Sequence, residues 1–170
     1  TKLGYTCWLD VNMKNKSEEA MREGVQNSSC VVAIITGPCV NNDKPNDKPE
    51  LNGFFKREYC LKELRWAIEK NIFIQPVVRT KDREQIGELM SFAPNDLIEL
   101  QKIEFVSLDR SDVTYWDAGV KKICDKLKEE TSPDLLDLYA KSRDIFKEEQ
   151  LSKTSNSSGL RSKSGCCVIA

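Results

Sequence analysis

A continuous apolar run, Val31–Ile35, constrains the fold of this chain more than any other feature. Such a run, rich in β-branched residues and without polar alternation, predicts a strand covered on both faces. A segment with helical spacing of its apolar residues, Phe54–Lys70, follows, and then a second apolar run, Ile72–Val78. Strands that alternate with helices predict an α/β fold with a parallel, doubly wound sheet.

The remaining segments continue this alternation. Ser17 is a favourable N-cap, and Glu18 and Glu19 would lie in the first helical turn, where the helix dipole favours negative charge. We expect strands at Cys7–Val11 and Ile103–Leu108, a long exposed loop at Gly37–Glu50, and helices at Glu84–Phe92, Val113–Glu130 and Pro133–Leu151. The chain would then comprise an α/β domain (1–130), a charged helix (131–151) and a flexible tail (152–170). Whether the charged helix belongs to the domain or is a stalk remains open.

Composition excludes several classes of function. The chain has no histidine, which excludes His-ligated metal sites and nucleophilic catalysis with a histidine base. Its net charge of -1 gives no global basic field for nucleic acid. The seven cysteines form no Cys-x-x-Cys motif, so no metal site is expected. Their odd number and the position of several within apolar runs predict free thiols and a reducing, intracellular compartment. No apolar run reaches the roughly 18 residues of a membrane-spanning helix. The first residue is Thr1 rather than Met, so we expect a processed chain or part of a longer one.

Several segments, taken in order, resemble a TIR (Toll/interleukin-1 receptor/resistance protein) domain over about residues 3–130. They are Trp8–Val11, Ala20–Val25, Ser28–Thr36, Tyr59–Leu64 (similar to the Trp-Cys-Leu-x-Glu-Leu segment of the family) and Ile74–Val78. The resemblance implies a flavodoxin-like parallel sheet with helices on both faces. The strand and helix that open a TIR domain are missing here, so we expect this stretch to be poorly stable by itself.

The resemblance also implies a function. TIR domains are intracellular signalling modules, many of them in innate immunity, that assemble with other TIR domains, homotypically or heterotypically. Some cleave NAD+ with the acid of the Trp-Cys-Leu-x-Glu-Leu helix, which corresponds to Glu63. Nicotinamide leaves as a neutral ring, so a single carboxylate that stabilises the cationic ribose suits a site without histidine. Tyr59 and Trp66 are the candidate substrate-binding aromatics. NAD+ would be the substrate, and no cofactor is expected.

The last four residues, Cys167–Ala170, fit a C-a-a-X prenylation motif, and the final alanine indicates farnesylation. One lipid binds a membrane only marginally, so a second signal is expected. Cys166 is the candidate palmitoylation site, and Lys153, Arg161 and Lys163 add a thin basic patch. The protein is therefore expected in the cytoplasm, tethered to the cytosolic face of a membrane.

Two alternative functions stay open. One is a catalytically inert TIR adaptor or scaffold. The other is a phospho-receiver domain with Asp10 as the phospho-acceptor and Thr36 as the switch residue. Lys14 stands where receivers usually have proline, and Gln75-Pro76 stands where Lys-Pro would follow the next strand, which counts against the receiver.

Overall fold

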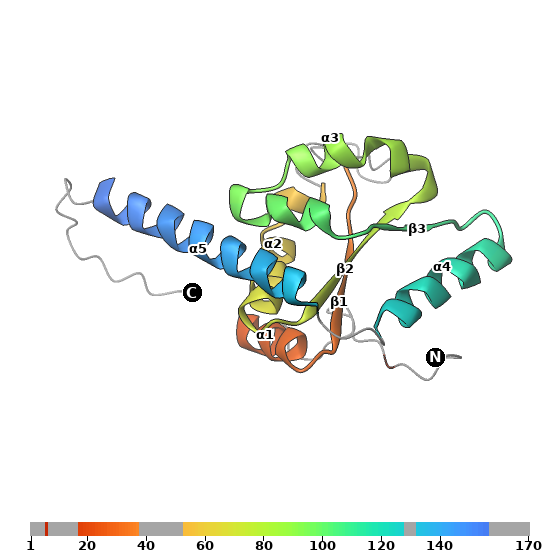
Figure 1. The fold of residues 1–170 in the computed structure, drawn as a ribbon, viewed down its shortest axis with the longest axis horizontal. Coiled ribbons are helices and arrows are strands. Elements are labelled where there is room, and N and C mark those ends of the chain that lie inside the picture. The colour runs from red at the N-terminus through yellow and green to blue at the C-terminus, as the bar shows by residue number, and fades with distance from the viewer. Residues whose placement is uncertain (1–5, 7–16, 38–52, 128–131, 157–170) are drawn as a thin grey trace, which may run out of the picture.

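Three parallel strands form the sheet, in the order β1-β2-β3 (Figure 1). The computed structural model describes residues 6, 17–37, 53–127 and 132–156. In chain order the elements are α1 (Glu18–Gln26), β1 (Cys30–Ile34), the 3-10 helix η3 (Phe54–Lys56), α2 (Glu58–Glu69), β2 (Phe73–Arg79), the 3-10 helix η4 (Thr80–Gln85), α3 (Ile86–Ser91), the 3-10 helix η5 (Asn95–Lys102), β3 (Val106–Leu108), α4 (Val113–Lys126) and α5 (Pro133–Asn156).

Helices cover the sheet from two sides. In Figure 1, α1, α2 and α5 lie to the left of the sheet and α4 to its right. The main core lies on the first side, and a smaller cluster of Val77, Val106 and Ile123 lies under α4. Gly119 lets α4 approach β3, because a Cβ there would lie 2.6 Å from Cδ2 of Leu108. The predicted α/β class with a flavodoxin-like parallel arrangement is confirmed.

The first helix forms for the local reasons that its sequence indicates. The Ser17 hydroxyl accepts a hydrogen bond from the backbone N–H of Ala20 at 3.2 Å, which satisfies one of the free donors at the helix start. Met21 and Val25, one turn apart, bury the inner face of α1. The predicted N-cap and helix are confirmed.

Several predicted boundaries are wrong. The helix predicted over 54–70 is interrupted, since Arg57 is extended and separates η3 from α2. The strand predicted over 103–108 starts only at Val106, where the pairing with β2 begins; before it, the carbonyl of Glu104 accepts a hydrogen bond from the side chain of Gln75 at 2.9 Å. The helix predicted over 84–92 is the end of η4 followed by the short α3.

The expectation that Val31–Ile35 is covered on both faces is also wrong for the described part of the chain. Ala33 and Ile35 face the core and are 3% and 2% exposed. Val32 and Ile34, on the opposite face, are 44% and 53% exposed. α4 covers the β3 side of that face and leaves these two side chains of β1 accessible.

The charged helix shares the domain core. Leu135, Leu138 and Tyr139 belong to the main cluster of buried residues. The Tyr139 hydroxyl donates to the carbonyl of Ile72 and accepts from the N–H of Ile74, both at 3.0 Å, which fastens α5 to β2. The first turns of α5 are thus part of the folded unit, while its later turns project from it (Figure 1).

Some predicted features lie outside the described residues. They are the strand at Cys7–Val11, residues 38–50 of the predicted loop, and the C-a-a-X motif with Cys166 and Cys167.

Candidate functional site

The helix that carries Glu63 starts close to the carboxyl end of β1. The backbone N–H of Phe54, in η3, donates to the carbonyl of Thr36 at 2.9 Å, and α2 follows directly at Glu58. This bond holds the first turns of α2 beside the carboxyl edge of the sheet. Open parallel sheets bind their ligands at that edge.

Glu63 and Tyr59 lie one turn apart on α2. Residues at positions i and i+4 of a helix are neighbours on one face. Glu63 is half-buried, and Tyr59 is 44% exposed. The structure therefore has a half-buried acidic residue and an accessible aromatic residue on neighbouring turns of one helix face.

Trp66 is placed differently. It is only 8% exposed and belongs to the main core. Lys62 and Glu69, one turn before and after it, form ion pairs with Glu18 and Arg22 of α1. Helix α1 therefore runs along this side of α2 and leaves little of the indole ring for a ligand. The accessible candidates on α2 are Glu63 and Tyr59.

Sequence analysis did not single out Lys62. Its Nζ lies 2.6 Å from Oε2 of Glu18, 2.8 Å from Oε1 of Glu58 and 5.1 Å from the centroid of the Tyr59 ring. The hydrogen bonds that Lys62 donates to the carboxylates of Glu18 and Glu58 raise the pKa of Lys62, and the hydrogen bond from Lys62 lowers the pKa of Glu58. The spacing of Glu58 and Lys62 signals a helical ion pair, whereas the contact with Glu18 depends on tertiary packing.

Other acids after the strands stabilise local structure. Asp82, after β2, is buried and pairs with Arg79. Asp109, after β3, accepts hydrogen bonds from the N–H and hydroxyl of Ser111, which lower its pKa. Asp112 caps α4 by accepting from Thr114 N at 2.7 Å. These three carboxylates therefore have turn or capping roles.

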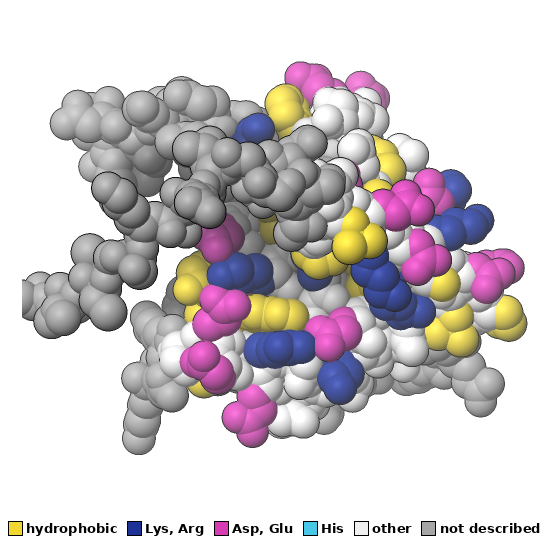
Figure 2. All heavy atoms as spheres, turned by 90° about the vertical axis from the view of Figure 1, so that its left-hand side faces the viewer, with side chains coloured by type: hydrophobic (Ala, Val, Ile, Leu, Met, Phe, Trp, Pro, Cys, Tyr) yellow, Lys and Arg dark blue, Asp and Glu magenta, His cyan; other side chains and the backbone are white. Residues whose placement is uncertain are grey.

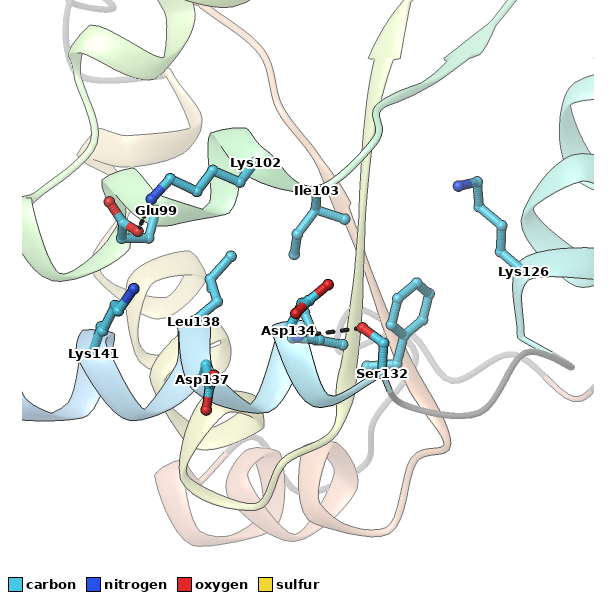
Figure 3. Close-up of a pocket in the computed structure, with 11 residues that line it drawn as sticks. Glu99, Lys102, Ile103, Lys126, Ser132, Asp134, Asp137, Leu138 and Lys141 are labelled. Carbon is cyan, nitrogen blue, oxygen red and sulfur yellow. Dashed lines mark hydrogen bonds and ion pairs between the residues drawn. The ribbon is translucent and has the colours of Figure 1, made fainter.

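A pocket of about 390 Å³ lies at the other edge of the sheet. Phe73, the first residue of β2, and Ile103, just before β3, line it together with the first turns of α5. Figure 3 shows Glu99 and Lys102 of η5 paired on one side, with Asp134, Asp137 and Lys141 of α5 below them. Glu63, Tyr59 and Trp66 do not line this pocket, which is separate from the candidate site.

The described surface carries mixed charge. Figure 2 shows basic and acidic side chains interspersed on one face. On α4, Lys122 and Lys126 both pair with Glu104, at 2.6 and 2.7 Å, and these hydrogen bonds lower the pKa of Glu104 to about 2. Among the described residues no cluster of three or more ligands is placed to hold a metal ion. Within the same residues, no helix is both long and apolar enough to cross a membrane.

Of the residues expected in a phospho-receiver site, Asp10 lies outside the described part, and the backbone carbonyl of Thr36 accepts the hydrogen bond from Phe54 that positions η3.

Comparisons of the chain with protein-family models, with curated proteins and with solved structures gave no match, so the resemblance to TIR domains stays a prediction.

Proposed function

We propose that this chain is a TIR-type intracellular signalling module that cleaves NAD+ at the bond between nicotinamide and ribose, with Glu63 as the catalytic residue. The placement of Glu63 carries the proposal. It is a half-buried carboxylate beside the accessible ring of Tyr59, on a helix that starts at the carboxyl edge of a parallel sheet.

The chemistry requires one well-placed carboxylate. When the bond between the pyridine nitrogen and C1′ of the ribose breaks, its electron pair goes to the nitrogen and neutralises the ring. The positive charge then develops on the ribose, where the Glu63 carboxylate stabilises it and holds a ribose hydroxyl. Tyr59 would stack on a ring of the substrate. Partial burial of Glu63 strengthens this electrostatic effect, because the local dielectric is lower than in water.

Assembly and membrane attachment complete the proposal. The module assembles with other TIR domains, and a lipid on Cys167, aided by Cys166, concentrates copies at the cytosolic face of a membrane. Confinement raises the effective concentration, which favours weak self-association. Mass spectrometry of the natural C-terminus tests the anchor: an unmodified Cys167 contradicts it.

Nicotinamide release from NAD+ tests the catalytic part. The natural protein, concentrated on vesicles, is compared with Glu63→Gln, which preserves size and removes the charge. We expect release to fall by about 100-fold or more, the effect of removing one preorganised electrostatic contact. Glu148→Gln, at an exposed acid of α5, is the matched control and should match the natural protein.

Absence of release from a folded natural protein would contradict the enzyme. The chain would then fit an inert TIR adaptor or scaffold. Equal release from the natural protein and from Glu63→Gln would place the activity at another residue.

A further inference from the structure

Lys62 links α1, α2 and the ring of Tyr59. Its ammonium group contacts Glu18 of α1 at 2.6 Å and Glu58 of α2 at 2.8 Å, and it lies 5.1 Å from the centroid of the Tyr59 ring. The Lys62 side chain is 27% exposed, whereas Glu58 on the outer side is 74% exposed. One ammonium group is therefore fixed by two helices and lies against one face of an aromatic ring.

We propose that Lys62 is a positioning residue that holds the Tyr59 ring so that its opposite face stacks on the pyridine ring of NAD+ beside Glu63. The inference rests on the proposed function and assigns a part of its substrate site. Lys62 does not touch the substrate. It acts through Tyr59, which is 44% exposed and carries the ammonium group over one face of its ring.

Preorganisation is the physical reason for this role. An exposed tyrosine on a helix samples more than one side-chain rotamer, and binding must select one of them. A cation over one face favours the rotamer that keeps the ring beneath it. Because Glu18 and Glu58 already hold Lys62, the ammonium group is in place before a substrate arrives.

The local charge also suits the substrate. The carboxylates of Glu18 and Glu58 carry two negative charges and Lys62 carries one positive charge, so the three groups have a net charge of −1. The pyridine ring of NAD+ is positively charged before cleavage, so a net negative surrounding attracts it. The ammonium group alone would repel that ring, and its two carboxylate partners offset the repulsion.

Steady-state kinetics of nicotinamide release by the natural protein test this role. Lys62→Met keeps an unbranched apolar chain and removes the charge. We expect its KM for NAD+ to rise about two- to fivefold, as loss of a cation–π contact predicts, with kcat within twofold of the natural protein. Lys62→Arg should restore most of the lost affinity. Lys70→Met, at an exposed lysine just after α2, is the matched control and should leave KM unchanged.

A double-mutant cycle separates positioning from a general structural effect. In a Tyr59→Ala background, Lys62→Met should raise KM no further, because the ring it positions is gone. Glu18→Gln is a second variant that loosens Lys62 without changing α2, and it should raise KM in the same direction by a smaller factor. Urea unfolding of each variant shows that it is folded.

Two results overturn the inference in distinguishable ways. If the natural protein releases nicotinamide and Lys62→Met has the same KM for NAD+, the positioning role is refuted and the proposed function stands. A folded natural protein that releases none refutes the proposed function and the inference together.

Discussion

The thiol of Cys30 lies at the start of β1, in the sheet. Burial raises its pKa from the ordinary value of 9.0 to about 12, and a hydrogen bond from the backbone N–H of Gln75 opposes part of this rise. In the unfolded chain the thiol therefore loses its proton at lower pH than in the folded protein. Between pH 9 and 12 the folded state binds more protons than the unfolded state, so stability must fall as pH rises.

This difference predicts a pH dependence at one residue. We expect the free energy of unfolding to decrease between pH 9 and 12 more steeply in the natural chain than in Cys30→Ala. The difference in slope should be at most about 1.4 kcal/mol per pH unit. Urea unfolding at a series of pH values measures both slopes. Identical slopes would show that the thiol titrates alike in both states.

At the scale of elements, one ion pair joins three segments. Arg65 of α2 donates from Nε and Nη2 to the two carboxylate oxygens of Asp96 in η5, at 2.7 and 3.0 Å. Its guanidinium carbon also lies 4.7 Å from the ring centroid of Phe146 in α5. The side chain of Asp96 is only 1% exposed, so its charge depends on this partner.

Asp96→Asn should therefore destabilise the fold. Breaking a fully buried pair costs about 3–5 kcal/mol, and we expect about 2 kcal/mol because Arg65 keeps access to water. Urea unfolding measures the loss as a lower midpoint with an unchanged slope. Asp137→Asn, at an exposed position of α5, is the control. Equal stability of the two variants would show that the pair contributes nothing.

Elements whose signals are local could be predicted from the sequence. The cap at Ser17 and the acids after it define the start of α1, and the apolar run places β1 within one residue. Non-local packing decided the rest. The pairing of β2 with β3 begins only at Val106, and α4 packs on the β3 side of the outer face while Val32 and Ile34 of β1 stay exposed.

In the candidate site, too, some features could be predicted from the sequence and others depend on tertiary packing. Helical spacing places Glu63 and Tyr59 on one face, and the structure keeps that neighbourhood. The burial of Trp66 and the contact of Lys62 with Glu18 both depend on α1 packing against α2. Neither is visible in the periodicity of a single helix, because periodicity shows which residues share a face and not what packs against it.

At the scale of the whole molecule, the folded unit includes the first turns of α5. Its first turns share the core with the sheet through Leu135, Leu138 and Tyr139. Asn95 of η5 also donates to Glu149 of α5 at 3.1 Å. The predicted lipid anchor follows this helix in the chain.

Two identical substitutions on α5 test this unity. Leu138 is 8% exposed and Leu151 is 69% exposed, so Leu→Ala changes helix propensity alike at both positions while only one removes core contacts. We expect Leu138→Ala to lose about 2–4 kcal/mol of unfolding free energy and Leu151→Ala less than about 0.5 kcal/mol. Urea unfolding followed by circular dichroism and by tryptophan fluorescence should give one coincident transition for each variant, because the helix and the sheet unfold together. Separate transitions, with Leu138→Ala shifting only the helical signal, would instead identify α5 as an independent stalk.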